Sequence, residues 1–194
     1  MDMARIAIVV GNPQSASYSE ALGLAYLRGA QSGGHQAQLF ALARMKFDAI
    51  LREGYRCEQA LEPDLAAARD AFIACDHVVF VFPLWCGDMP AIMKGFIERV
   101  LQPDLLKIHK SGSAAGWKMF NGKSAHVIMT MGMPGWFYRW YFGAHALKLL
   151  KRNILYFIGI KPVHTTIYGM VEAVGQERRQ QWLREVEALG TVAR

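Results

Sequence analysis

The sequence predicts an α/β fold, a doubly wound sheet of five parallel strands with helices on both faces. Short apolar runs rich in β-branched residues alternate with longer stretches of helical periodicity along the chain. Most of the runs show no polar alternation, as expected for strands that are buried on both faces. The chain has 194 residues, which is enough for one well-buried domain over 1–194 and too few for a comfortable second domain.

Strands are expected where apolar residues run together, and helices where they recur every three or four positions. Pro63 and Pro90 suit first helical turns, whereas Pro83 ends the most apolar strand. Residues 44–62 have no clear period and indicate an irregular surface excursion. The elements expected in this half are strands at 4–10, 36–41 and 78–82 and helices at 20–29, 64–75 and 90–101.

The second half continues the same alternation after a polar, glycine-bearing excursion at 102–122. A loop rich in Trp, Pro and Gly is expected at 132–138. The other expected elements are strands at 124–131 and 161–168, a basic helix at 141–158 and an amphipathic helix at 176–189. Five strands separated in this way favour the strand order 2-1-3-4-5.

The composition argues against a disordered chain, a membrane-spanning chain and a disulfide-rich chain. A hydrophobic content of 53% with 20% charged residues is typical of a globular chain. Basic residues interrupt the most apolar region, so no membrane span is expected, and the absence of a basic leader favours the cytoplasm. Three cysteines without CxxC spacing indicate neither a disulfide framework nor a metal site.

The net charge is +6, and the excess of basic residues is expected to be spread over several segments. No nucleic-acid partner is therefore expected, whereas attraction of an anionic dinucleotide is compatible with this charge.

The best candidate site is the loop at 84–89, because open α/β sheets bind ligands at the carboxyl ends of their strands. The loop at 132–138 follows another strand in the same way. Together the two loops resemble the walls of a pocket for a flat aromatic ligand. The alternative is that Trp85 and Trp136 are ordinary core residues.

A hydroxyl-rich loop at 14–19 joins the first strand to the first helix and could hold a phosphate at the positive end of that helix. It matches neither GxGxxG nor the P-loop. The alternative is that Ser17 or Ser19 only caps the helix. His164, in the last strand, is expected to be structural.

Several motifs resemble the NAD(P)H dehydrogenase (quinone) family of flavodoxin-like, DT-diaphorase-like flavoproteins. They are FPLW at 82–85 with MPAIMKGF at 89–96 and ERV at 98–100, TMG at 130–132 with Tyr138, ILYFIG at 154–159, and Asn12-Pro13 with Ser17 in the first loop.

The resemblance implies a bound flavin, FMN or FAD, with its phosphate on the first loop and its ring between the other two. FMN is favoured because the phosphate loop alone suffices for it. The implied cofactor-binding residues are Asn12, Ser17, Tyr18 and Ser19; Pro83, Leu84, Trp85, Cys86 and Gly87; and Thr130, Met131, Gly132, Met133 and Tyr138.

The resemblance also implies hydride transfer from NAD(P)H to the flavin and two-electron reduction of a quinone, with Tyr138 and His145 as the catalytic pair. The family's histidine aligns with Ala144, one residue before His145. A homodimer is implied as well, and the apolar residues Phe137, Trp140, Tyr141 and Phe142 would suit one. The alternative is a flavin-binding regulatory or accessory subunit of a membrane transport system, which would dock through residues 136–152.

Overall fold

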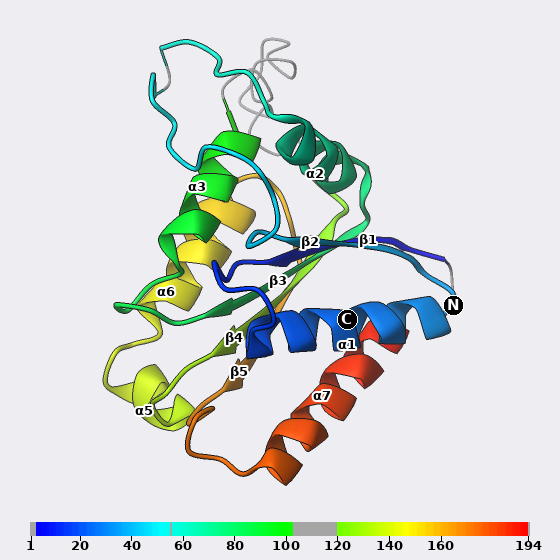
Figure 1. Cartoon of the computed structure of the whole chain (residues 1–194), viewed down its shortest axis with the longest axis vertical. Coiled ribbons are helices and arrows are strands. Elements are labelled where there is room, and N and C mark those ends of the chain that lie inside the picture. The colour runs from blue at the N-terminus through cyan, green and yellow to red at the C-terminus, as the bar shows by residue number, and fades with distance from the viewer. Residues whose placement is uncertain (1–2, 55, 103–119, 194) are drawn as a thin grey trace.

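The computed structural model describes residues 3–54, 56–102 and 120–193. Its centre is a sheet of five parallel strands in the order β2-β1-β3-β4-β5 (Figure 1). The predicted fold class and strand order are therefore confirmed. The strands are β1 (Arg5–Val10), β2 (Gln36–Ala41), β3 (His77–Pro83), β4 (Ser124–Thr130) and β5 (Val163–Tyr168).

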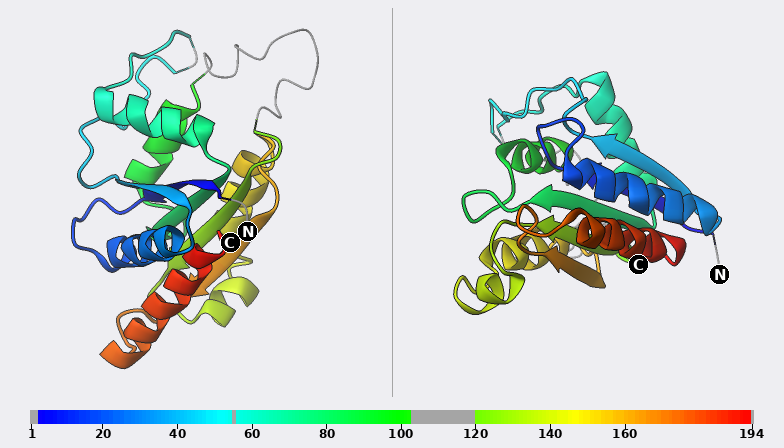
Figure 2. Two further views of the ribbon diagram at one scale, coloured as in Figure 1. Left: turned by 90° about the vertical axis from the view of Figure 1, so that its right-hand side faces the viewer. Right: turned by 60° about the horizontal axis from the view of Figure 1, so that its bottom comes forward.

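Helices cover both faces of the sheet (Figures 1 and 2). Helices α1 (Tyr18–Ser32) and α7 (Gln176–Thr191) pack against one face and against each other. The opposite face is covered by α2 (Pro63–Ala74), α3 (Ala91–Val100), α6 (His145–Lys148) and the π-helix η2 (Leu149–Leu155). The short helix α5 (Gly135–Trp140) precedes α6.

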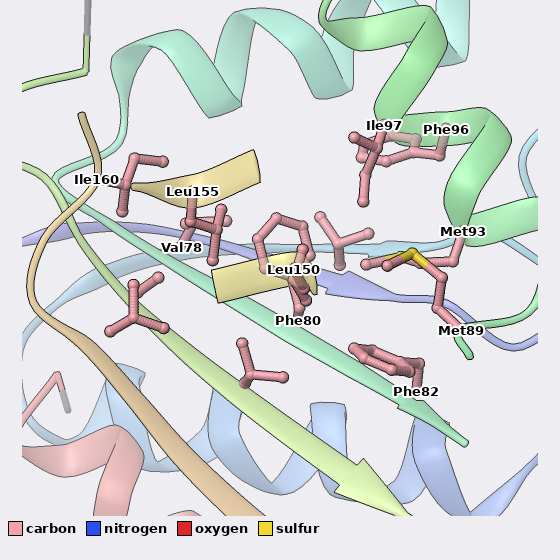
Figure 3. Packing of buried hydrophobic residues seen from close by; sticks show 14 of the residues in the cluster. Val78, Phe80, Phe82, Met89, Met93, Phe96, Ile97, Leu150, Leu155 and Ile160 are labelled. Carbon is pink, nitrogen blue, oxygen red and sulfur yellow. The ribbon is translucent and has the colours of Figure 1, made fainter. Parts of the chain in front are cut away.

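The central strand β3 is buried along its whole length. Its side chains alternate, so that Val78, Phe80 and Phe82 join the core under α3 and Val79 and Val81 join the core under α1. Figure 3 shows the α3 side of this packing. Burial on both faces explains why this strand is continuously apolar in the sequence.

Two predictions for residues 132–158 are wrong. A helix, α5, begins at Gly135 inside the stretch predicted as a loop. The predicted single helix at 141–158 instead starts only at His145, because the chain turns through Gly143 and Ala144 with φ of 58° and 51°. These left-handed values interrupt a right-handed helix.

The excursion at 44–62 is irregular, as predicted, but it is anchored rather than lying loosely on the surface. Arg99 of α3 is fully buried and donates hydrogen bonds to the carbonyl oxygens of Asp48 and Ala60. Arg99 also pairs with the Glu62 carboxylate at 2.9 Å. Most of the excursion predicted at 102–122 lies outside the described residues.

A group of histidines lies on the α1 side of the sheet, near the amino ends of the strands. His77 hydrogen-bonds through Nδ1 to Ser124 Oγ at 2.7 Å and stacks on Tyr26 with ring centroids 6.3 Å apart. His126 bonds to Thr166 and lies 6.2 Å from His164. His164 therefore lies beside this group, and its structural role stays a prediction.

This histidine group should make folding stability depend on pH. Burial, and to a smaller extent three neighbouring histidines, lower the pKa of His77 from 6.5 to about 3. Between these values the unfolded chain binds a proton that the folded protein does not. The free energy of unfolding is therefore expected to fall as the pH drops below about 6.5, by up to about 1.4 kcal/mol per pH unit from this residue.

Urea denaturation at pH 7, 6 and 5 measures this dependence. In a His77→Gln variant the slope between pH 6.5 and 5 should be smaller than in the wild type by that amount. Equal slopes in the two proteins would show that His77 is not the titrating group.

Candidate active site

Three loops meet at the carboxyl edge of the sheet, and we refer to them as the first loop (residues 11–17), the second loop (84–90) and the third loop (131–134). Backbone hydrogen bonds hold the first two against neighbouring strands. Gly11 donates to the Val81 carbonyl oxygen at 2.8 Å, and Leu84 donates to the Thr130 carbonyl oxygen at 2.8 Å. The loops that the sequence singled out are thus brought to one edge.

The first loop is shaped by two side-chain hydrogen bonds. The Asn12 Oδ1 atom accepts from the Gln14 N–H at 2.9 Å, and the Ser17 Oγ atom accepts from the Glu20 N–H at 3.3 Å. Ser17 is therefore the N-cap of α1, as the capping alternative predicted. A hydroxyl that accepts one hydrogen bond can still donate its own hydrogen to a ligand. Ser19 is buried in the first turn of α1.

An ion pair between Glu20 and Arg44 lies beside this loop and was not predicted from the sequence. The buried Glu20 carboxylate accepts from the Ala16 N–H at 2.6 Å and from the Arg44 guanidinium at 2.6 Å. Arg44 thus neutralises a negative charge that would otherwise oppose a phosphate at the α1 N-terminus. The Ser-x-x-Glu spacing from Ser17 to Glu20 is a capping-box signature and was the available signal.

Tyr18 anchors the start of α1 to α7. Its hydroxyl donates to the Arg179 carbonyl oxygen at 2.9 Å, and burial raises its pKa to about 12. The phenol is therefore engaged within the protein, which leaves the backbone N–H of Tyr18 as the group that could meet a phosphate.

The second loop is a tight turn. Trp85 and Asp88 exchange two backbone hydrogen bonds of 2.9 Å, and the residues between them, Cys86 and Gly87, have φ of 49° and 81°. Positive φ at both central positions defines a type I′ turn. The N–H of Trp85 is used inside the turn, whereas those of Cys86 and Gly87 have no acceptor within the described part of the chain.

The third loop is braced by the segment after β5. Met131 donates to the Tyr168 carbonyl oxygen at 2.9 Å and accepts from the Val171 N–H at 3.1 Å, and Met133 accepts from the Met170 N–H at 3.1 Å. Gly132 is exposed, and a Cβ there would meet no atom within 4 Å. The loop is therefore fixed on one side and open on the other.

Both tryptophans of these loops are exposed rather than buried. Trp85 is 42% exposed and Trp136 is 69% exposed. The alternative that they are core residues is therefore wrong, and their rings are available to a ligand or a partner.

The two residues of the implied catalytic pair, Tyr138 and His145, differ in their exposure to solvent. Tyr138 is buried, and its hydroxyl accepts a hydrogen bond from the Leu147 N–H at 3.4 Å, in the first turn of α6. Burial raises the pKa of Tyr138. His145, the first residue of α6, is exposed. A proton relay through these two residues stays a prediction.

A hollow of about 570 Å³ opens beside the first loop, between α1, the end of β2 and α2. It does not lie between the aromatic loops, where the sequence predicted a pocket. Glu20 and Arg44 contribute its charged wall, and the other lining residues are Leu24, Leu39, Phe40, Ala41, Met45, Asp64 and Ala67.

Residues 4–189 match the model of the family described as "Flavodoxin-like fold". The chain belongs to this family. In the flavodoxin-like fold the carboxyl ends of the strands at the point where the strand order reverses form the ligand site. Here that point is the edge where the first and second loops meet.

Several curated proteins with named activities are similar to this chain. The chain is 24% identical to an uncharacterized NAD(P)H oxidoreductase of Haemophilus influenzae, over 96% of this chain and 94% of the relative. It is 28% identical to NAD(P)H dehydrogenase [quinone] 1 of Rattus norvegicus, over 68% of this chain and 50% of the relative. The chain spans only 58%, 50% and 56% of the length of three curated relatives that it matches.

A solved structure with a more distantly related sequence has the same fold as this chain. A FMN-dependent NADH-azoreductase of Bacillus anthracis, in complex with FMN, matches with a TM-score of 0.72 at 16% identity, over 99% of this chain and 100% of that one.

The described residues were searched for membrane-spanning helices and for metal-binding clusters. In that part of the chain no helix is long and apolar enough to cross a membrane. The same residues hold no cluster of three or more His, Cys, Asp or Glu side chains arranged for a metal ion. Cys57, Cys75 and Cys86 are free thiols.

Proposed function

We propose that the protein is an FMN-binding NAD(P)H oxidoreductase that reduces a quinone or a similar acceptor. The observation that carries this proposal is the meeting of the three loops at the carboxyl edge of the sheet. The names of the relatives in Haemophilus influenzae and Rattus norvegicus support the reaction, and that of the azoreductase supports FMN rather than FAD.

The residues of the first loop fit a flavin phosphate. The first-turn N–H groups of Tyr18 and Ser19 lie at the positive end of α1, and the Ser17 hydroxyl lies beside them. Arg44 balances the Glu20 carboxylate at the same place. The phosphate would therefore meet donors with little opposing charge.

The residues of the other two loops fit a planar ring system. Gly132 leaves open space on the third loop, and the N–H groups of Cys86 and Gly87 lie at the tip of the second loop. The exposed Trp85 ring offers an apolar surface that would keep water away from the bound ring. Bound FMN would supply the redox chemistry, accepting a hydride from NAD(P)H and passing two electrons to the acceptor.

The proposal includes a single flavin-binding domain over residues 1–194 and a location in the cytoplasm. The homodimer stays a prediction, and light scattering at working concentration tests it directly. Tyr138 and His145 stay candidates for proton transfer, with His145 the more accessible of the two.

Steady-state kinetics test the reaction. Protein loaded with FMN should oxidise NADH or NADPH rapidly when a naphthoquinone is added, and far more slowly without it. Free FMN at the same concentration is the control. If the protein binds FMN but shows no turnover above this control, the proposal that it is an enzyme is contradicted. That result would favour the accessory subunit, an alternative that neither the described structure nor the relatives support.

A further inference from the structure

The end of β5 lies directly against the backbone of the third loop. Gly169 follows the last residue of this strand. A Cβ atom at this position would lie 2.5 Å from the Gly135 nitrogen and 2.7 Å from the Met133 carbonyl oxygen. Non-bonded heavy atoms are most stable at roughly 3.5–4.0 Å. The two stretches of backbone are therefore so close that only glycine, which has no side chain, fits between them.

Backbone hydrogen bonds flank this contact on both sides. On one side, Met131 donates to the Tyr168 carbonyl oxygen at 2.9 Å and accepts from the Val171 N–H at 3.1 Å. On the other side, the Met133 carbonyl oxygen accepts from the Met170 N–H at 3.1 Å. The close approach is thus part of a continuous pairing between the end of β5 and the third loop.

This pairing uses the carbonyl oxygens of the third loop and leaves two of its N–H groups unused. The N–H groups of Gly132 and Met133 have no acceptor within residues 3–54, 56–102 and 120–193. Gly132 is also exposed, with open space where a Cβ would be. These two N–H groups are therefore free to donate to a ligand, and their positions depend on how the third loop lies against β5.

The β5 side of the contact is the better anchored of the two. Tyr168 is buried, and its ring packs against Trp182 of α7 with centroids 4.8 Å apart. The carbonyl oxygen of Met170 accepts from the Val174 N–H at 3.0 Å, which fixes the turn after the contact. The third loop, by contrast, is open to solvent at Gly132. An added methyl group at the contact would therefore displace the third loop rather than β5.

We propose that Gly169 is a positioning residue of the flavin site, because it lets β5 hold the third loop where the Gly132 and Met133 N–H groups meet the flavin ring. The inference rests on the proposed function, since it assigns those N–H groups to bound FMN. Donors at the ring stabilise the electron-rich reduced flavin more than the oxidised flavin. Displacing them should therefore weaken flavin binding and lower the reduction potential of the bound flavin.

A Gly169→Ala variant tests the proposal. The φ angle of Gly169 lies outside the left-handed range, so alanine suits the backbone and the methyl group acts through the contact alone. We expect the dissociation constants of FMN and of riboflavin, which lacks the phosphate, both to rise about tenfold. Fluorescence titration of the flavin-free protein measures both constants. Equal changes for the two ligands would place the effect at the ring rather than at the phosphate.

The reduction potential of bound FMN separates positioning from a general loss of structure. In Gly169→Ala we expect reduced FMN to lose about tenfold more affinity than oxidised FMN. For a couple of two electrons, this difference lowers the potential by about 30 mV. Spectrophotometric titration against a reference dye measures it.

The matched control is Gly33→Ala, at the opposite end of α1 from the first loop. A Cβ there would lie 2.4 Å from the Thr191 carbonyl oxygen, which is the same kind of close backbone contact. This variant should lower the melting temperature of the flavin-free protein. It should leave both flavin affinities and the reduction potential as in the wild type.

A second variant, Gly135→Val, presses on the same contact from the side of the third loop. A Cβ at Gly135 would lie 3.3 Å from the Ile167 Cγ2 atom, so the strain is milder, and valine suits a helix better than glycine does. We expect a folded protein whose affinities for FMN and riboflavin fall about threefold. If Gly169→Ala does not fold, this variant decides the matter.

Three results would overturn the inference. They are wild-type affinities for both flavins in Gly169→Ala, or in Gly135→Val where Gly169→Ala does not fold; a loss confined to FMN; and an equal loss in Gly33→Ala. In each of these cases the wild type still binds FMN, so the proposed function stands. A wild type that binds neither FMN nor riboflavin would overturn the proposed function, and this inference with it.

Discussion

Replacing both Ser17 and Ser19 with alanine is expected to weaken FMN binding on the order of a hundredfold or more, because each hydroxyl would lose a hydrogen bond to a charged phosphate, worth roughly 1.5–3 kcal/mol. Ser17 also caps α1, so the flavin-free protein should lose about 1 kcal/mol of stability as well. Fluorescence titration of FMN and thermal melting of the same flavin-free variant measure the two effects separately.

A Ser17→Asp variant separates binding from capping. Aspartate is a good N-cap residue, so the stability of the flavin-free protein should be retained, but its negative charge should repel the phosphate and weaken FMN binding. Ser15→Ala, in the exposed part of the same loop, is the control and should change neither quantity. If FMN affinity were unchanged in both Ser17→Ala/Ser19→Ala and Ser17→Asp, the assignment of the phosphate site to this loop would be wrong.

The second large effect is expected at Arg99. An Arg99→Met variant would fill much of the same volume but leave the Asp48 and Ala60 carbonyl oxygens without this donor, and it would leave the Glu62 carboxylate without its cation, with only the Asp48 N–H still donating to it. Breaking a buried pair by removing one partner typically costs about 3–5 kcal/mol. Glu62 is partly exposed, so we expect a loss near the lower end of this range, measured by urea denaturation.

The matched control for Arg99 lies on the same helix. Lys94 pairs with Glu98 one turn away, and both side chains are partly exposed. Lys94→Met should therefore cost about 0.5 kcal/mol or less. If Arg99→Met were as mild as this control, Arg99 would not anchor the excursion at 44–62.

The fold could be predicted from the sequence because its strands are buried on both faces. The continuous apolar run at 78–82 has few alternatives to a central parallel strand, and the structure extends it by only one residue at each end. Helix α1 begins two residues before and ends three residues after the predicted range 20–29.

The helical boundaries near the site could not be predicted in the same way. Apolar periodicity continues from Tyr141 through Ile158, and nothing in it marks Ala144 as a left-handed residue. Gly143, with φ of 58°, is the one local signal of the break, and the Tyr138 hydroxyl accepts from the Leu147 N–H on the other side of it.

The candidate site was predicted at the level of loops rather than of side chains. The positions of the loops follow from strand order, whereas the roles of their residues depend on partners distant in sequence. Arg44 meets Glu20, and Tyr18 meets the Arg179 backbone, across 24 and 161 positions of the chain. No local pattern contains those contacts.

Titration of flavin-free protein with FMN, followed by flavin fluorescence, tests the central claim that the three loops form a flavin site. We predict saturation at about one FMN per chain, with the bound flavin giving the protein a yellow colour. A protein that takes up neither FMN nor FAD under these conditions would contradict the claim.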